Sequence, residues 1–229
     1  MSESKTPLCK IDWYNKDTVY QGIYRVLNTE NRLPDPCEIM ILPPLPIPKE
    51  AHERVYGLCW RDKKEIWFRM QPPNYIEFAH ELLHLIEGKE VELEEVYAYN
   101  LSHLVVMLAE NNINPPVNPV RLFTDATVDM VLQALREVYG YPFNNIAEYF
   151  EVIGVIPPFL RLDFDPARNS VVIKYDPEYD ERSIVIVTIT ELIAGAEYDR
   201  AMLNVVLKLL EKIAAKRGGS DLWRASASR

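Results

Sequence analysis

The spacing of apolar residues along the first half of the chain predicts helices and short strands. Val19, Ile23, Val26 and Leu27 recur at helical intervals, whereas later apolar runs are short and end at prolines or charged residues. The expected elements are a helix over 18–28, strands over 37–42, 55–60 and 65–70, and helices over 75–87 and 91–110. Residues 61–64 separate two of the strands and predict a hairpin.

A segment rich in asparagine and proline, residues 111–119, interrupts these patterns and marks the expected domain boundary. Beyond it we expect helices over 125–139 and 145–153, strands over 159–165, 171–175 and 183–190, and an amphipathic helix over 191–216. The predicted domains are residues 1–112 and 120–217, followed by a polar tail, 218–229, expected to be disordered. Both domains mix helices and strands, so the predicted fold class is α+β.

Composition and charge narrow the classes of function. The chain has 229 residues, 48% of them hydrophobic, which suffices for a sizeable core. Its formal net charge of −9 argues against a broad nucleic-acid-binding surface. The helices expected within residues 127–153 have lengths typical of a helix-turn-helix. This stretch contains a single arginine, Arg136, to contact DNA phosphates, so DNA binding is not expected. No run of 18 apolar residues exists and the N-terminus lacks the apolar core of a secretory signal, so we expect a cytoplasmic protein that does not span the membrane.

The cysteines predict no metal site and no complete disulfide framework. Cys9, Cys37 and Cys59 are widely spaced, are odd in number and form no C-x-x-C pair. We expect them to be buried as small hydrophobic residues. A bridge between one pair stays open for a protein of hyperthermophilic origin.

The strongest chemical signal is the sequence HELLH at residues 80–84. It lies in the apolar-periodic stretch 75–87, which Asn74 and Glu77 are expected to open as a capping box and Gly88 to end. Histidines four residues apart on a helix share one face and can bind one metal ion. The pattern therefore predicts that His80 and His84 bind Zn²⁺ and that Glu81 acts as a general base on water.

A third ligand is expected from the following helix, because catalytic zinc commonly has three protein ligands and one open position. Glu95 is favoured, because Ala98 three residues later would let this helix approach the first closely. Glu92 and His103 lie on the same helical stripe and stay open as alternatives. Tyr97, Tyr99 and His103 are candidate donors to a reaction oxyanion, although such tyrosines are more often packing residues. We assign this role to Tyr99 and His103.

These motifs resemble those of the gluzincin zinc peptidases. VYGLCWRDKKEIWFRMQPPNYIEFAHELLHLI, followed by ELEEVYAYNLSHLVVML, is similar to the core of ImmA/IrrE-type metallopeptidases and of minimal archaeal gluzincins. The resemblance covers about residues 37–108. It implies a zincin-like core of strand, hairpin, HExxH helix and glutamate helix, with a C-terminal α+β extension of unknown role. It also implies hydrolysis of a polypeptide that binds as an added strand beside residues 55–60 or 65–70.

Two other interpretations stay open at the level of sequence. One is a non-catalytic binding or regulatory protein that has a zincin fold, with or without zinc. The other is a surface helix whose histidines and glutamate are merely solvated, although three of the four histidines fall between positions 80 and 103. The sequence does not predict an oligomeric state.

Overall fold

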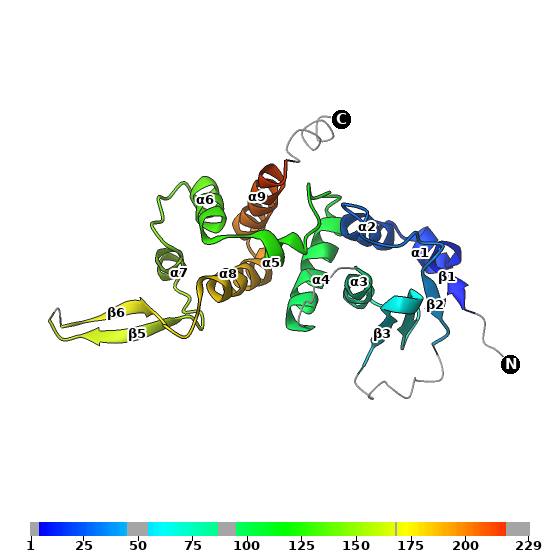
Figure 1. The fold of residues 1–229 in the computed structure, drawn as a ribbon, viewed down its shortest axis with the longest axis horizontal. Coiled ribbons are helices and arrows are strands. Elements are labelled where there is room, and N and C mark those ends of the chain that lie inside the picture. Colours follow the sequence, from blue (N-terminus) through cyan, green and yellow to red (C-terminus); the bar gives the residue numbers. More distant parts are fainter. Residues whose placement is uncertain (1–4, 45–54, 87–94, 168, 219–229) are drawn as a thin grey trace. The chain divides into compact units, whose positions relative to one another are not determined.

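The computed structural model describes residues 5–44, 55–86, 95–167 and 169–218 (Figure 1). The chain forms two compact units, Met1–Val120 and Arg121–Arg229, which are described separately below. Both contain helices and strands, so the predicted mixed α+β class is confirmed. None of the helices in these ranges is long and apolar enough to cross a bilayer.

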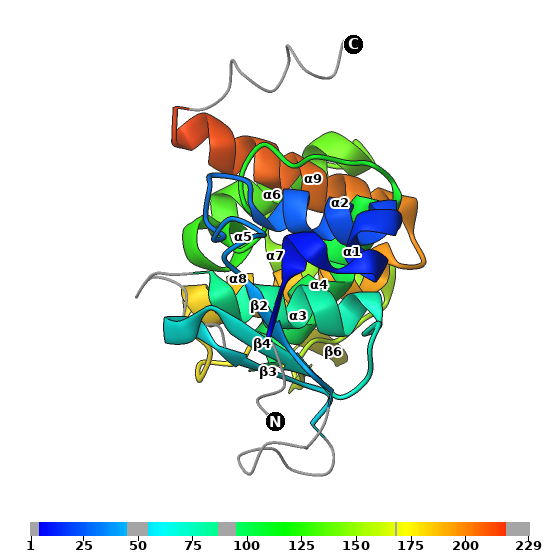
Figure 2. The ribbon, with the colours of Figure 1, turned by 90° about the vertical axis from the view of Figure 1, so that its right-hand side faces the viewer.

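The first unit contains a four-stranded sheet with helices on one side. Strands β1 (Thr6–Pro7), β2 (Met40–Leu42), β3 (Gly57–Trp60) and β4 (Glu65–Phe68) have the spatial order β1-β2-β4-β3. β2 and β4 are parallel, and the other two neighbouring pairs are antiparallel. The helices are η1 (Leu8–Lys10), α1 (Asp12–Lys16), α2 (Thr18–Leu27), η2 (Arg61–Lys63), α3 (Tyr75–Leu85) and α4 (Glu95–Glu110). Figure 2 shows α3 between the strands and the helices α1 and α2.

The core of this unit lies between α3 and its neighbours. Phe78 of α3 is fully buried, and its ring meets the rings of Tyr20 and Trp13 at centroid distances of 5.1 and 5.6 Å. The central strand β4 is buried through Ile66, Trp67 and Phe68, whereas every residue of the edge strand β3 is half-buried. This packing fixes α3 against β3, and it leaves one edge of β3 without a strand partner among the described residues.

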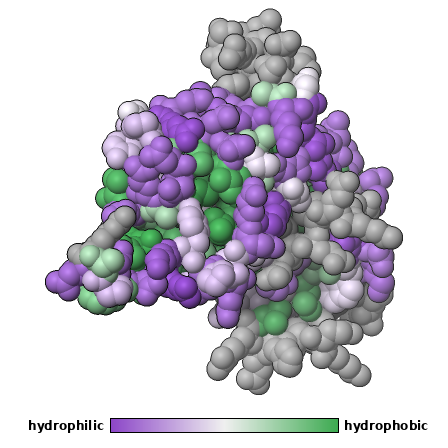
Figure 3. Space-filling view, turned by 60° about the vertical axis from the view of Figure 1, so that its left-hand side comes forward, coloured by the Kyte–Doolittle hydropathy of each residue, from purple (hydrophilic) through white to green (hydrophobic). Residues whose placement is uncertain are grey.

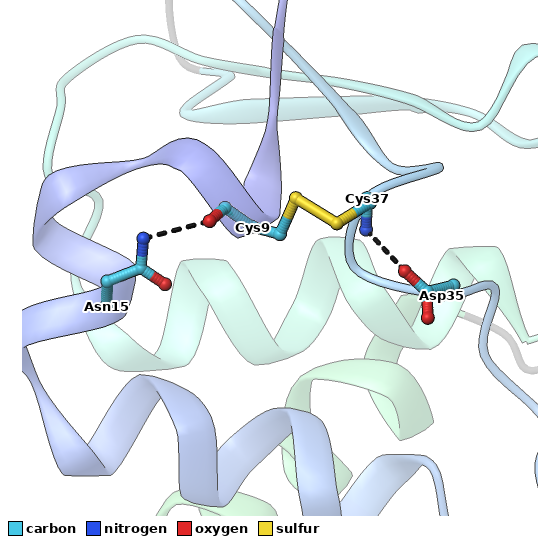
Figure 4. Close-up of a disulfide and its surroundings, with 4 residues drawn as sticks. All are labelled: Cys9, Asn15, Asp35 and Cys37. Atoms are coloured by element: carbon cyan, nitrogen blue, oxygen red, sulfur yellow. Dashed lines mark hydrogen bonds between the residues drawn. A yellow bond between two sulfur atoms is a disulfide. The ribbon is translucent and has the colours of Figure 1, made fainter.

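A disulfide joins Cys9 of η1 to Cys37, which precedes β2 (Figure 4). The Asn15 side chain donates to the Cys9 carbonyl at 2.9 Å, and the Cys37 N–H donates to the Asp35 carboxylate at 2.8 Å. The expectation that these cysteines are buried as small hydrophobic residues is therefore wrong, because Cys9 is half-buried and Cys37 is exposed, and the bridge left open as an alternative is present. Their separation of 28 residues gave no sign of pairing, because only the reversal of the chain brings their Cα atoms to 4.9 Å. Cys59 is free.

The second unit is built on helices, with one hairpin. Its elements are α5 (Arg121–Asp125), α6 (Val128–Tyr139), α7 (Ile146–Ile153), β5 (Leu160–Asp165), β6 (Ser170–Tyr175), α8 (Glu181–Ala196) and α9 (Arg200–Lys216). Helix α9 packs on α5, α6 and α8 through a stripe that includes Val206, Leu209 and Ile213. Strands β5 and β6 form a two-stranded antiparallel sheet (Figure 1).

The strand predicted over 183–190 is wrong, because these residues belong to α8. The Asp180 side chain accepts a hydrogen bond from Ser183 N and caps the helix, and Thr188 and Thr190 donate to carbonyls one turn earlier. Burial of Val185 and Ile189 outweighs the β-propensity of these branched side chains.

The helix expected over 191–216 is divided in the structure. Residues 191–196 form the end of α8, and α9 begins after Asp199, whose side chain caps it by accepting from Ala201 N. The helix expected over 125–139 agrees with α6, which begins at Val128 after its cap, Thr127. Helix α5 was not predicted.

The other predicted elements agree with the structure to within a few residues. The strand expected over 37–42 begins only at Met40. The helix expected over 75–87 ends at Leu85 with Ile86 as its C-cap, so Gly88 is not the cap and lies outside the described residues. Residues 91–94 and, apart from Gly218, the predicted tail also lie outside them.

Candidate metal centre

The HELLH sequence lies on α3, and the predicted capping box opens this helix. The Asn74 side chain accepts from Glu77 N at 2.8 Å, and Asn74 N donates to the Glu77 carboxylate at 3.3 Å. The cap fixes the first turn of the helix, and burial of Phe78 and Leu82 fixes its rotation about its axis. As a consequence, His80, Glu81 and His84 face a pocket beside β3.

The two histidines point their Nε2 atoms at one another. These atoms are 3.0 Å apart, and the ring centroids are 4.7 Å apart. Nδ1 of His80 is buried and has no hydrogen-bond partner among the described residues, so Nε2 is the nitrogen that this ring presents to the pocket. Burial first, and then the neighbouring His80, lower the pKa of His84. Both effects favour the neutral imidazole, which is the form that binds a metal.

Glu95 brings a carboxylate to the same point from α4. Its oxygens lie 3.1 Å from His80 Nε2 and 3.5 Å from His84 Nε2. Helix α4 packs directly on α3, and Ala98, one turn after Glu95, is 1% exposed. This agrees with the close approach expected from a small residue at that position. The donor atoms of His80, His84 and Glu95 all lie within 4.8 Å of one another.

The spacing of these three donors fits a tetrahedral zinc ion. Zinc bonds of about 2.0–2.1 Å to nitrogen and oxygen place two tetrahedral ligands about 3.3 Å apart. The two Nε2 atoms are 3.0 Å apart, and the two carboxylate oxygens of Glu95 lie one at 3.1 Å from His80 and the other at 3.5 Å from His84, so each of these distances is close to that value. Two neutral imidazoles and one carboxylate are also a donor set that zinc accepts, with a fourth position left open.

Glu81 is held apart from the three donors, against strand β3. It is 5% exposed, and a Cβ atom added to Gly57 would lie 2.4 Å from its Oε1 and 2.7 Å from its Cγ. Burial, and to a lesser extent the charges of Glu95 and Glu77, raise the pKa of Glu81 to about 8. Only glycine at position 57 lets the carboxylate lie this close to the strand.

The pocket beside these residues has a volume of about 740 Å³. Its walls come from β3 and the adjoining hairpin, from α3 and from the start of α4; the lining residues are Val55, Tyr56, Gly57, Leu58, Cys59, Arg61, Asp62, Ile76, Glu77, His80, Glu81, His84, Glu95 and Tyr99. Arg61 Nε donates to the His84 carbonyl at 2.8 Å and ties the end of α3 to the hairpin. The size of the pocket and its partly apolar lining suit a ligand larger than a metal ion.

The other predicted site residues differ in their relation to the pocket. Tyr99 lines it, with an exposed side chain whose ring lies 4.8 Å from the ring of His103. His103 is half-buried and belongs neither to the pocket lining nor to the group of three donors. Tyr97 is not among the lining residues either, and Glu92 lies outside the described residues.

Sequence reasoning missed Gly57, Arg61 and Cys59, which all line the pocket. A glycine inside a predicted strand signals close approach of another group, so Gly57 carried a usable signal. Burial, followed by the charge of Glu81, raises the pKa of the Cys59 thiol to about 12, which keeps it protonated at neutral pH. Nothing in the sequence pointed to Arg61.

Comparison with known proteins provides no relative. No family model matches the chain, and no curated protein or solved structure is significantly similar to it.

Proposed function

We propose that the protein is a zinc-dependent peptidase with a gluzincin-like site. The observation that carries the proposal is the convergence of His80, His84 and Glu95 on one point, beside a separate buried carboxylate, Glu81. Three donors at zinc spacing and an independent base in one pocket are the two parts that metal-assisted hydrolysis requires. A merely solvated helix would not need a glycine on the opposite strand to accommodate Glu81.

The proposed reaction is hydrolysis of a peptide bond. Zinc, when bound by His80, His84 and Glu95, would supply Lewis acidity that polarises a carbonyl and lowers the pKa of water. The positive charge of bound zinc would offset the burial that raises the pKa of Glu81 and favour its carboxylate form. In that form Glu81 would accept a proton from the attacking water and pass it to the nitrogen of the leaving amine. The hydroxyl of Tyr99, which lines the same pocket one turn after Glu95 on α4, is the proposed donor to the developing oxyanion. His103 supports the Tyr99 ring from the next turn rather than acting on the substrate.

We further propose that the substrate binds as an extended strand on the free edge of β3, the edge that has no strand partner among the described residues. Arg69 N donates to the Tyr56 carbonyl at 2.8 Å, so these two residues form a hydrogen-bonded antiparallel pair. Since such pairs alternate with non-hydrogen-bonded ones along a ladder, Leu58 directs its backbone groups to β4. Gly57 and Cys59 direct theirs to the free edge, which gives a substrate two donors and two acceptors next to Glu81.

The other strand considered for this role, residues 65–70, is not available. β4 (Glu65–Phe68) has β2 on one side and β3 on the other, so both of its edges are paired. Recognition through backbone groups favours unfolded or extended polypeptides over folded ones, because only an extended segment can add to a sheet edge.

The proposal is tested by comparing Glu81→Gln with Glu77→Gln on a denatured polypeptide library, with cleavage followed by mass spectrometry. Glu77 is a matched control, because it lines the same pocket one turn earlier and because glutamine preserves a capping box. Glu81→Gln should retain zinc and lose at least about 100-fold in cleavage rate, the usual contribution of a general base. Glu77→Gln should cleave at a rate close to that of the wild type. A wild-type protein that binds zinc but cleaves nothing would instead favour a metal-binding protein without catalysis.

A further inference from the structure

The β5–β6 hairpin of the second unit has one apolar face and one polar face. The register pairs Leu160 with Tyr175, Leu162 with Ile173, and Phe164 with Val171. Because side chains on paired residues share a face and alternate along each strand, these six residues form one continuous apolar surface. The opposite face carries Arg161, Asp163, Asp165, Ser170, Val172 and Lys174, with an ion pair of 2.8 Å between Lys174 and Asp163.

The apolar face is covered at its base and open toward its tip. Leu160 is buried, and Tyr175 stacks on Phe159 and accepts a hydrogen bond from Ala147 N of α7. Further out, Leu162 and Phe164 are each 57% exposed and Val171 is 63% exposed. Figure 3 shows apolar residues at the surface on this side of the molecule, bordered by hydrophilic ones. An isolated two-stranded hairpin is marginally stable in water, so such a face is expected to have a partner.

We propose that this face is an interface between two copies of the chain, which pack their hairpins face to face about a twofold axis. In such an interface each copy contributes the same patch, with Leu162, Phe164 and Val171 at its centre. Two sheets packed in this way bury both apolar faces at once, at the ordinary spacing of about 10 Å. The polar faces stay in water.

The charge of the hairpin favours a second copy over a partner of opposite charge. The chain carries a formal net charge of −9, so two copies repel one another over most of their surface. The hairpin strands carry two basic residues, Arg161 and Lys174, against two acidic ones, Asp163 and Asp165. This surface is therefore locally neutral, and its charges lie on the face that stays in water.

The exposed area of the face also suits a dimer interface. Four apolar side chains of the hairpin are 40–63% exposed; they are Leu162, Phe164, Val171 and Tyr175. With areas on the order of 150–200 Å² each, they expose roughly 400 Å² in total. A standard interface buries about 800 Å² on each partner and is a little more than half apolar, so polar residues at the rim would supply the remainder.

The test compares two neighbouring residues of β6 whose side chains lie on opposite faces. Wild type, Val171→Lys and Val172→Lys are measured as full chains by sedimentation velocity at about 1–100 μM. The wild type should sediment as a dimer of twice 26.6 kDa. Val171→Lys should raise the dimer dissociation constant at least tenfold, because a charge would enter the apolar centre, whereas Val172→Lys should leave it unchanged. Phe164→Lys repeats the test from β5, and circular dichroism verifies that each variant is folded.

Three results would overturn the proposal. One is a wild-type chain that stays monomeric at the highest concentration. Another is dissociation of the dimer to the same extent by Val171→Lys and Val172→Lys, or by neither. The third is a monomeric wild type together with a lower thermal stability of Val171→Lys than of Val172→Lys. The apolar face of the hairpin would then be covered by another part of the same chain.

Discussion

Replacement of Gly57 by alanine separates the role of Glu81 from metal binding. The new Cβ would lie 2.4 Å from Glu81 Oε1 and 2.7 Å from its Cγ, whereas non-bonded carbon contacts are about 3.5 Å or longer. Glu81 is buried and the Cβ is part of the backbone frame, so the carboxylate has to move by about 1 Å. A displacement of this size costs on the order of 100-fold in rate when it affects a reacting group. We therefore expect Gly57→Ala to lower peptide cleavage about 100-fold.

The stability and the zinc content of the Gly57→Ala variant can be predicted from the same contact. Alanine in a strand normally stabilises a protein by about 0.5–1 kcal/mol relative to glycine, whereas overpacking costs about 1–3 kcal/mol. Gly57→Ala should therefore lower the free energy of unfolding, and Glu81→Ala in the same chain should restore most of the loss. Zinc binding should persist, because the three atoms nearest to the new Cβ all belong to Glu81 and none to the three donors. Unchanged cleavage and stability in Gly57→Ala would refute this account of the pocket.

Three further predictions concern stability. Replacing Cys9 and Cys37 by serine should lower the unfolding free energy by about 3–4 kcal/mol in chemical denaturation, because the bridge closes a loop with a sequence separation of 28. Asn118 is fully buried; its side-chain amide donates to the Leu27 carbonyl and accepts from Val120 N. Asn118→Leu should therefore lower the free energy of unfolding by about 3 kcal/mol, whereas the same change at an exposed asparagine should lower it by less than about 0.5 kcal/mol. Burial opposes but does not cancel the hydrogen bonds from Thr124 and Arg217, which together with nearby arginine charges lower the pKa of Asp125. We therefore expect wild type to have a higher free energy of unfolding than Asp125→Asn at neutral pH, by at most about 1 kcal/mol. This difference should disappear as the pH falls through the lowered pKa of Asp125, and a difference that grows in acid would contradict the prediction.

The sequence predicted α3 and the grouping of His80 and His84 on one face of it because local signals agreed there. The capping box of Asn74 and Glu77, the apolar period and the spacing of the histidines all act within one helix, and each follows from residues a few positions apart. The choice of Glu95 over His103 was harder, since both lie on the same stripe of α4. They are about 12 Å apart along the helix axis, so only the place where α4 meets α3 decides which one reaches the histidines.

The features that the sequence did not predict depend on contacts between distant segments. The β-branched run at 183–190 has strand propensity, but the cap at Asp180 and burial in the second unit make it helical. The Cys9–Cys37 bridge and the contact of Gly57 with Glu81 join residues that the chain brings together only after folding. Propensity and periodicity contain no information about such contacts.

The central claim is that His80, His84 and Glu95 form a zinc site, and it is tested most directly by metal content. Purified wild type, His84→Ala and His103→Ala are dialysed against a buffered zinc solution and analysed by elemental mass spectrometry. We predict about one zinc per chain for the wild type and for His103→Ala, and a loss of about 100-fold or more in affinity for His84→Ala. A wild-type chain without stoichiometric zinc, or equal zinc content in the two histidine variants, would contradict the account.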